Sequence, residues 1–279
     1  MEVSKPPTLQ TETLIGELCT HASAPMRFRL ATGELCFVKY ILEQASEYDD
    51  LAYEWVGHYL AKHFGISTPQ IAAIEVQAGS YDPHKLFRNA KNFQPGAVAF
   101  GSIHIGDNTS LSTAFIDSVR KKAYWNRIEN REEMVRLSLL DLLIDNQDRS
   151  EDNYNILQTP AFKNASKCWA IDHAAAFGGA LQRGKIKPFP INESAKYVVS
   201  QHFRIICKHL KPTIFTTELE HFMYLCNSLD KPVNQAFESM PKSWRISKDL
   251  KERMLEMLTN KPRLEQLKGI WQAAVNRNL

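Results

Sequence analysis

The sequence predicts an α+β fold in which a small β-rich N-terminal lobe precedes a larger helical C-terminal lobe. Two observations lead to this prediction. Short apolar runs separated by turn residues occupy much of the chain before residue 106, whereas apolar residues at helical spacing dominate beyond Leu111. We place the boundary after residue 105, which divides the chain into lobes over 1–105 and 106–279.

Four elements are expected early in the N-terminal lobe: a frayed arm over 1–10, a β-hairpin over 26–38, a helix over 51–64 and a strand over 68–76. The hairpin prediction rests on two apolar runs that flank a turn at 31–34. The helix is expected to begin after Asp49 and Asp50 and to stop at Gly65, because glycine readily adopts the left-handed conformation that ends helices. Further strands are expected between 77 and 106.

The C-terminal lobe is expected to be mainly helical. Residues 132–144 are rich in leucine and predict a buried helix, and the spacing over 217–275 predicts several amphipathic helices. Because proline cannot continue a helix, these are expected to break at Pro232, Pro241 and Pro262. Residues 145–190 are expected to form a loop, a short strand and another loop.

The composition argues against several classes of protein. The formal net charge of +3 is small for 279 residues and no run rich in Lys or Arg stands out, so direct nucleic-acid binding is not expected. The five cysteines are scattered without a CxxC pair, which argues against a disulfide framework and a zinc site. No apolar signal core or run of membrane-spanning length is present. We therefore expect a cytoplasmic protein without a membrane partner.

The stretch most informative about function is the loop over 145–157, which places acidic residues and asparagines between apolar elements. Downstream, the apolar residues 168–171 predict a strand that carries Asp172 at its end. Such a loop suits a divalent cation, because Mg²⁺ prefers oxygen ligands. A solvated surface turn is the simpler alternative, since Asp, Asn and Ser also favour turns.

Phosphoryl transfer needs few protein groups, and the sequence offers them in a workable order. Lys39 ends an apolar strand and is a candidate for binding nucleotide phosphates, and Glu54 on the next helix is a candidate for orienting that lysine. Asp148 is the candidate base, with Asn153 and Asp172 as candidate metal ligands. The alternatives are a surface lysine at a strand end and an exposed glutamate, because Glu54 lies away from the apolar stripe of its helix.

Asp148 followed by Asn153 has the spacing of the protein-kinase catalytic loop, and Asp172 takes the place of the metal-binding aspartate. More narrowly, the chain resembles the HipA-like kinases of bacteria, which are serine/threonine kinases related to toxin–antitoxin modules. The resemblance spans roughly 18–191 in outline. The segments that carry it are 37–39, 54–69, 146–155 and 171–173.

The resemblance implies a bilobal protein-kinase-like fold, with ATP and Mg²⁺ as cofactors. It implies transfer of the γ-phosphate to a Ser or Thr hydroxyl of a protein substrate, with autophosphorylation and an antitoxin-like partner as further expectations. It assigns nucleotide binding to Lys39 and Glu54, catalysis to Asp148 and metal binding to Asn153 and Asp172. The chain begins almost at the first kinase strand, so it looks like a compact member without the extra N-terminal subdomain of larger HipA proteins.

The sequence departs from the family pattern in two segments. Larger HipA proteins carry a histidine and a lysine between the catalytic Asp and Asn, where this chain has Ser150 and Asp152. The cation near the γ-phosphate then either comes from Arg149, which we count as a catalytic candidate, or is missing. The segment 20–25 stands in place of a glycine-rich phosphate loop but holds no glycine, and offers Ser23 and backbone N–H groups for nucleotide binding.

Two other functions stay open. One is a small-molecule kinase of the aminoglycoside or choline type on the same lobe plan. The other is a non-catalytic pseudokinase that acts as a binding module. Ser150, Asp152 and the glycine-free segment 20–25 are the best support for the pseudokinase.

Overall fold

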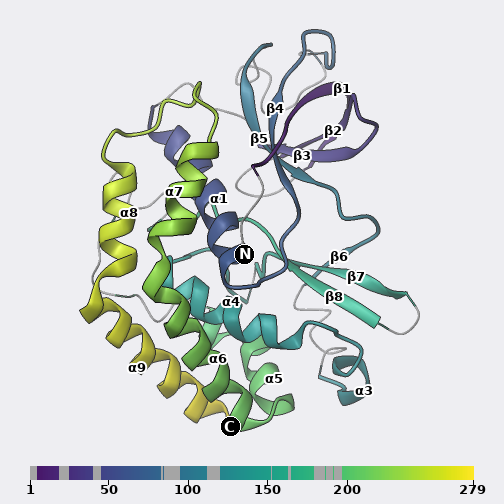
Figure 1. The fold of residues 1–279 in the computed structure, drawn as a ribbon. Helices are drawn as coiled ribbons and strands as arrows, with labels where there is room; N and C mark the ends of the chain where they lie inside the picture. Colours follow the sequence, from purple (N-terminus) through teal and green to yellow (C-terminus); the bar gives the residue numbers. More distant parts are fainter. Residues whose placement is uncertain are drawn as a thin grey trace.

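The computed structural model describes residues 5–18, 25–39, 45–82, 84, 95–111, 120–151, 153–162, 165–178, 186, 191 and 197–279. Within this part of the chain, five strands close into a barrel, and helices and a second sheet of three strands lie beside it (Figure 1). The fold is therefore a mixture of strands and helices, with most of the strands first and most of the helices last, as the sequence predicts.

The barrel strands are hydrogen-bonded in the order β1 (Thr8–Glu17), β2 (Met26–Leu30), β3 (Leu35–Lys39), β5 (Val98–Ile103) and β4 (Ile71–Glu75). The predicted hairpin is confirmed, because β2 and β3 pair antiparallel with Met26 opposite Val38. Alternate residues of these strands, among them Phe28, are completely buried in the core of the barrel. The expected arm over 1–10 is partly wrong. β1 already begins at Thr8, where it pairs in parallel with β4.

Helix α1 (Ala45–His63) follows β3 and is buried at every position from 51 to 61. It ends as predicted before Gly65, whose φ of +63° is left-handed. The predicted start is wrong, because Asp49 and Asp50 lie inside the helix. Asp49 instead accepts hydrogen bonds from the backbone N–H and the hydroxyl of Ser247, at 3.0 and 2.7 Å.

The second sheet consists of β6 (Thr109–Ser110), β7 (Ile156–Phe162) and β8 (Ala165–Ala170). β8 is the predicted strand before Asp172, and it begins three residues earlier than the apolar run at 168. β7 was expected to be part of a loop. It forms a strand because Ile156 and Leu157 pair antiparallel with the end of β8.

The remaining helical elements are α3 (Lys122–Trp125), α4 (Arg131–Leu143), η4 (Tyr197–Val199), α5 (Gln201–His209), α6 (Pro212–Leu225), η5 (Cys226–Ser228), α7 (Asp230–Ser239), α8 (Leu250–Thr259) and α9 (Lys261–Asn278). The leucine-rich helix is confirmed as α4, and its leucines are buried. The proline breaks are also confirmed. Pro232 and Pro262 lie in the first turns of α7 and α9, and Pro241 follows the end of α7.

The described residues form two hydrophobic cores. The smaller one fills the barrel. The larger one joins α1 to the C-terminal helices, with Trp55 from α1, Leu139 from α4 and Trp271 from α9 among its members. This core crosses the boundary expected after residue 105, so α1 packs as one unit with helices from the other predicted lobe. The lobe boundary itself stays a prediction.

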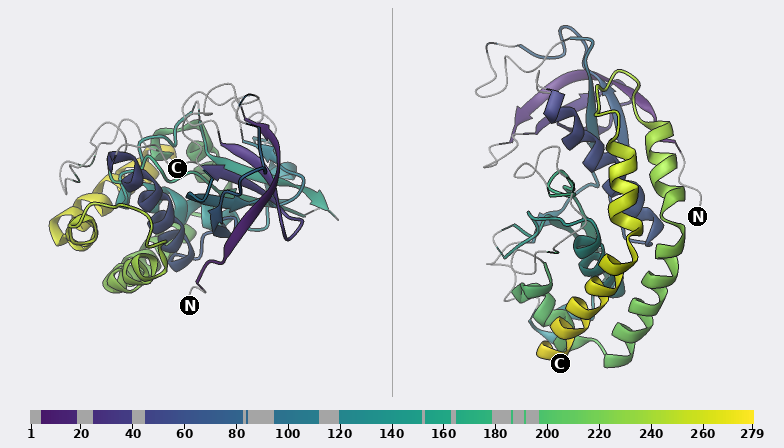
Figure 2. Two further views of the ribbon diagram at one scale, coloured as in Figure 1. Left: turned by 90° about the horizontal axis from the view of Figure 1, so that it is seen from above. Right: turned by 90° about the vertical axis from the view of Figure 1, so that its left-hand side faces the viewer.

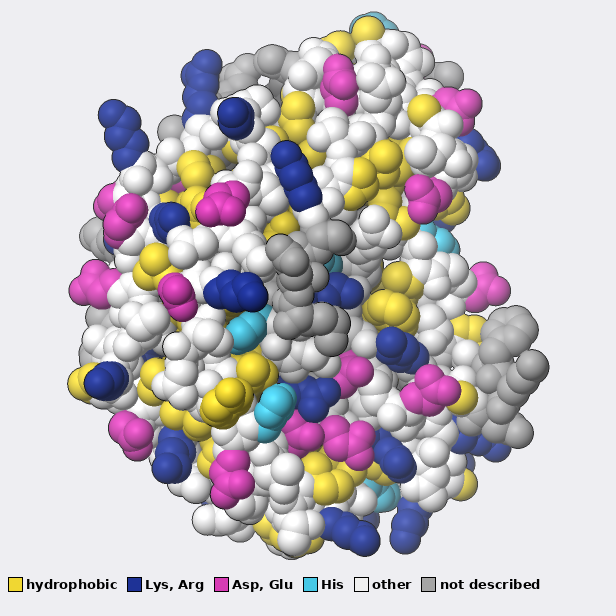
Figure 3. All heavy atoms as spheres, in the orientation of Figure 1, with side chains coloured by type: hydrophobic (Ala, Val, Ile, Leu, Met, Phe, Trp, Pro, Cys, Tyr) yellow, Lys and Arg dark blue, Asp and Glu magenta, His cyan; other side chains and the backbone are white. Residues whose placement is uncertain are grey.

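The surface in Figure 3 carries positive and negative side chains interspersed over the face shown, without a broad patch of one sign. Among the described helices, none combines the length and the apolar character needed to cross a membrane.

His202 of α5 lies in a buried aromatic cluster behind β7. Its ring centroid is 5.7 Å from that of Tyr154 and 5.6 Å from that of Tyr197, whose hydroxyl is hydrogen-bonded to Nδ1 of the histidine. Burial lowers the pKa of His202 from 6.5 to about 3. The folded protein therefore holds this histidine neutral at a pH where the unfolded chain protonates it.

We expect His202→Gln to weaken the pH dependence of the free energy of unfolding between about pH 3 and pH 6.5. The pKa of the histidine is lowered on folding, so its contribution is complete above pH 6.5 and is lost as the pH falls toward 3. Over this window it adds a slope of up to about 1 kcal/mol per pH unit to the free energy of unfolding. Urea unfolding at several pH values measures the slope. The exposed His221→Gln is the control, and an unchanged slope in His202→Gln would contradict the assignment.

Candidate active site

Lys39, Glu54 and Asp172 meet between the barrel, α1 and the second sheet. Lys39 is the last residue of β3, and its ammonium group forms ion pairs with Glu54 of α1 and with Asp172, whose Oδ1 lies 2.9 Å from Nζ. The lysine side chain is 16% exposed and that of Glu54 only 4%. Both residues therefore differ from the surface alternatives that the sequence left open.

The three charges set one another's ionisation. Burial favours the neutral form of Lys39, but the carboxylates of Asp172 and Glu54 outweigh it and raise the pKa of the lysine. Burial also opposes the charge of Asp172, yet Lys39 lowers the pKa of that carboxyl to about 2. For Glu54 burial prevails over Lys39 and raises the pKa to about 7. Asp172 is thus an ionised carboxylate near neutral pH, as a metal ligand must be.

Glu54 also holds the backbone beside Asp172. Its Oε2 accepts a hydrogen bond of 2.7 Å from the N–H of His173, while Oε1 pairs with Lys39. The exposed position expected from the helical wheel is wrong. The wheel assumes that a helix has one buried face, whereas both sides of α1 are covered here.

Asp148 lies in the loop between α4 and β7 and is half-buried. Its Oδ2 accepts hydrogen bonds from the side-chain amides of Asn153 and Asn155, at 2.8 and 2.9 Å. Within the described part of the chain, its Oδ1 accepts no hydrogen bond. Asn153 is exposed, and because its amide nitrogen points to Asp148, its amide oxygen faces away and is available to a cation. The predicted base and the predicted metal ligand are therefore in direct contact.

Arg149 does not occupy the position expected for a cation near the γ-phosphate, because its side chain has no exposed surface. Nε lies 2.8 Å from Oδ2 of the buried Asp141 in α4. The two terminal nitrogens donate to the carbonyls of Tyr154, Asn155 and Ile171, at 2.7, 2.5 and 3.2 Å. A guanidinium group held in this way connects α4, the loop over 145–155 and the strand end, and its side chain presents no surface to a ligand.

The loop and the strand end form one hydrogen-bonded unit. Asn155, which binds Asp148 through its side chain, accepts a backbone hydrogen bond of 3.0 Å from Ile171, the residue before Asp172. Several residues around this unit have left-handed backbones. The φ angles are 51° at Asp145, 47° at Asn155, 57° at Asp172 and 58° at Phe177. Strained conformations of this kind concentrate at functional sites.

This arrangement of a buried Lys–Glu pair, an aspartate at a strand end and an Asp–Asn loop agrees with a comparison against family models. The model described as HipA-like kinase matches residues 16–269. The chain belongs to the HipA-like kinase family. The resemblance inferred from the sequence is thereby confirmed, and it extends well beyond the 18–191 that the motifs indicated.

Solved kinase structures share the fold of this HipA-like kinase. The Helicobacter pylori proinflammatory kinase CtkA matches with a TM-score of 0.55 at 12% identity, over 98% of this chain and 100% of that one. The Golgi casein kinase matches with 0.55 at 14% identity, over 98% and 76%. Its structure with Mn/ADP bound matches with 0.52 at 13% identity, over 97% and 74%. A search of the curated protein sequences found no match.

Two residues of the sequence predictions have no described position in the structure. Ser23, with nearly all of the glycine-free segment 20–25, lies outside the described residues, as does Asp152. Ser150 lies in the turn of the candidate loop beside Asp148. Its N–H donates to the carbonyl of Asn153 at 3.0 Å, and the N–H of Asn153 donates back at 3.3 Å. The serine therefore helps to shape the loop.

Two residues without a role in the sequence predictions contact the candidate site residues. Asn155 donates the second hydrogen bond to Asp148, and Asp141 holds Arg149. Asp141 carried a signal, since it is a carboxylate among the leucines of 137–143 and buried charges are paired. For Asn155, the only signal in the sequence was its position in a loop rich in Asp and Asn.

The oxygen ligands available for a metal are few. Among the described residues, no group of three or more His, Cys, Asp and Glu side chains is arranged to hold a metal ion. Asn153 and Asp172 offer one amide and one carboxylate, which suits Mg²⁺, because nucleotide phosphates and water supply its other ligands.

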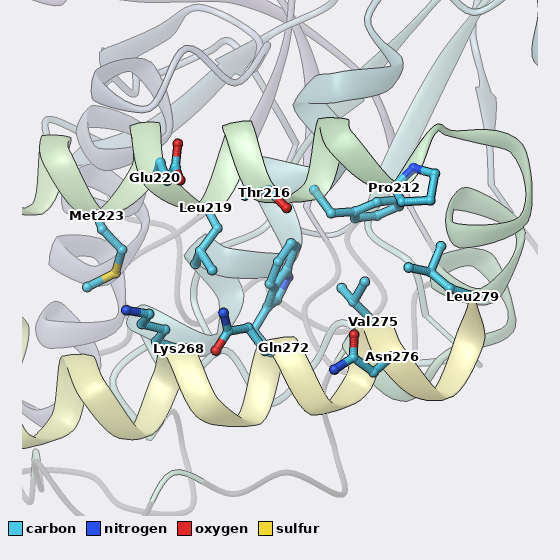
Figure 4. A pocket seen from close by; sticks show the side chains of 12 residues that line it. Pro212, Thr216, Leu219, Glu220, Met223, Lys268, Gln272, Val275, Asn276 and Leu279 are labelled. Atoms are coloured by element: carbon cyan, nitrogen blue, oxygen red, sulfur yellow. The ribbon is translucent and has the colours of Figure 1, made fainter.

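A separate groove of about 750 Å³ opens between α6 and α9 near the C-terminus (Figure 4). Phe215, Leu219 and Trp271 contribute to its lining together with polar side chains such as Glu220 and Lys268. None of the candidate site residues lines this groove, so it takes no part in the proposed chemistry.

Proposed function

We propose that this HipA-like kinase is a bilobal phosphotransferase, with lobes over 1–105 and 106–279, that moves the γ-phosphoryl group of ATP to a Ser or Thr hydroxyl of a protein. The observation that carries the proposal is the ion-pair network of Lys39, Glu54 and Asp172 connected to the Asp148–Asn153 loop. Use of a nucleotide and a divalent cation is supported by the similar Golgi casein kinase, whose structure holds Mn/ADP. Mg²⁺ is our proposal for the cation here.

Each residue has one role in this proposal. Lys39 binds phosphate oxygens, and Glu54 orients the lysine. Asn153 and Asp172 would hold the cation, which would supply positive charge against the phosphates. Asp148 accepts the proton of the attacking hydroxyl through Oδ1, which accepts no hydrogen bond from the described residues. At the same time the bond from the hydroxyl oxygen to the γ-phosphorus forms and the bond from that phosphorus to the ADP oxygen breaks.

We assign Arg149 a positioning role in place of the catalytic one. It contacts the backbone on both sides of the site, at Asn155 next to the Asp148 loop and at Ile171 next to Asp172. The Ser/Thr protein acceptor, autophosphorylation and an antitoxin-like partner rest on the family resemblance alone.

One observation favours the pseudokinase as a second candidate. Arg149 is committed to the interior, and Ser150 takes the place of a histidine, so the described part of the loop supplies no cation to the γ-phosphate. A pseudokinase would transfer no label from ATP to any acceptor. Binding without transfer would still raise stability, by about 2.7 kcal/mol at 100 times the dissociation constant.

Incubation with labelled ATP and Mg²⁺ tests the proposal, with Asp172→Asn as the diagnostic variant. We expect wild-type protein to label itself or an added Ser/Thr-containing protein. Asp172→Asn should raise the Mg²⁺ concentration needed for half-maximal rate by about 10–100-fold or more, because it loses a charged ligand. The exposed Asp107→Asn makes the same chemical change away from the site and should match wild type. Unaltered Mg²⁺ dependence in Asp172→Asn would remove this residue from the metal site.

A further inference from the structure

Helix α1, which carries Glu54, has no exposed face over residues 51–61. One side packs toward the barrel strands and the Asp172 turn. The other is covered by C-terminal helices, which lie over the side of the molecule seen in the right-hand view of Figure 2. A helix enclosed on all sides cannot shift without repacking its neighbours, since protein interiors are close-packed.

Ser239, the last residue of α7, makes the most specific contact with α1. Its Oγ accepts hydrogen bonds from the indole N–H of Trp55 at 3.0 Å and from the hydroxyl of Tyr59 at 2.7 Å. It donates its own proton to the carbonyl of Ala236 at 3.0 Å. One donor and two acceptor positions are the full capacity of a hydroxyl group, so Ser239 is completely used in holding α1.

The residues after Ser239 extend this contact from the middle of α1 toward its start. Trp244 packs edge-on against Trp55, with ring centroids 5.4 Å apart, and donates to the carbonyl of Val98 in β5 at 2.7 Å. Ser247 donates twice to Asp49, near the start of α1. The segment 239–247 therefore joins α1 to α7 and to the barrel.

On the opposite side, α1 lies as close to the Asp172 turn as its backbone permits. A Cβ atom at Gly57 would be 2.5 Å from the Cβ of His173, closer than such atoms approach in proteins. The N–H of the same histidine is bound by Glu54, one turn earlier in the helix. Movement of α1 toward this turn is blocked, and movement away from it breaks the contact with Glu54.

We infer that the segment 239–247 positions Glu54, with Ser239 as the positioning residue that holds the Lys39–Glu54 pair in its phosphate-binding arrangement. The inference rests on the proposed function, because it assigns the pair to nucleotide binding. It adds that the packing of the C-terminal helices against α1 sets the position of the Lys39 ammonium group, without a movement of α1.

The test compares Ser239→Ala with Ser239→Thr, which keeps the hydroxyl. Two quantities are measured: the KM for ATP and the rate of reductive methylation of Lys39, followed by mass spectrometry. Ser239→Ala leaves two buried donors without an acceptor, so we expect the KM to rise by roughly three- to tenfold with a smaller change in kcat, and Lys39 to be methylated faster. Ser239→Thr and the exposed Glu238→Ala should both behave as wild type.

Tyr59→Phe removes one donor from the α1 side and should move both values in the same direction by a smaller amount, which covers the case in which Ser239→Ala does not fold. If Ser239→Ala leaves the KM and the methylation rate within about twofold of wild type, the inference is wrong. An equal loss in the Thr and Ala variants would also overturn it. Measuring the methylation rate requires no catalytic activity. A wild-type protein that transfers no phosphate would therefore contradict the proposed function, while its methylation rate would still test the positioning of Lys39.

Discussion

Asp148→Ala is expected to lower the rate of phosphoryl transfer by roughly 10²–10⁴-fold while ATP binding stays nearly intact. The side chain of Asp148 contacts those of Asn153 and Asn155, whereas Lys39 and Asp172 pair with each other, so this ion pair is kept when Asp148 is removed. Its Oδ1, which has no hydrogen-bond partner among the described residues, is the atom that we assign to the proton of the acceptor hydroxyl. Single-turnover transfer from labelled ATP measures the rate, and the thermal shift with ATP and Mg²⁺ measures binding.

Asp148→Asn is the matched variant, because it keeps the shape of the side chain and removes the charge that accepts the proton. Both variants should lose transfer to a similar degree. Full transfer in Asp148→Ala would show that another group orients the hydroxyl. Loss of the ATP-induced thermal shift would instead show that the carboxylate helps to hold the nucleotide or its cation.

The largest effect on stability is expected from Arg149→Met, which should lower the free energy of unfolding by about 3–5 kcal/mol. The variant leaves Asp141 as a buried charge without its arginine and removes the donor from three backbone carbonyls. Equilibrium unfolding in urea measures the loss. Arg277→Met, at an exposed position of α9, is the control and should change stability by no more than about 0.5 kcal/mol.

A double variant separates the charge from the packing. Asp141→Leu combined with Arg149→Met removes both buried charges and should recover part of the stability lost by Arg149→Met alone, since apolar pairs can replace buried ion pairs. If Arg149→Met keeps wild-type stability and lowers only kcat, the arginine acts on the substrate after all, as the sequence first suggested.

Local sequence signals predicted the elements that are formed by residues close together in the sequence. The hairpin of β2 and β3, the end of α1 at Gly65 and the helix breaks near Pro232 and Pro262 all follow from turn chemistry and periodicity, and all are confirmed. The start of β1 at Thr8 and the strand β7 were missed. β1 begins where it pairs with β4, which is distant in sequence, and the pairing of β7 with β8 shifts in register between Thr159 and Phe162. Short-range patterns report neither feature.

The sequence by itself determined the types and the order of the site residues. Lys39, Asp148, Asn153 and Asp172 were chosen as candidates from their spacing and from their places at the ends of apolar elements, because phosphoryl transfer needs few groups. Their roles stay proposals. The same signals pointed to the HipA-like kinase family to which the chain belongs.

Only the tertiary structure decided where the side chains of Glu54 and Arg149 lie and what they contact. The helical wheel placed Glu54 at the surface, and the buried face it occupies exists because α7 and the barrel enclose α1. Arg149 stood next to the candidate base, yet its guanidinium group turns inward to Asp141 and three carbonyls. Burial and ion pairing depend on which segments meet in space, and a position in the sequence does not contain that information.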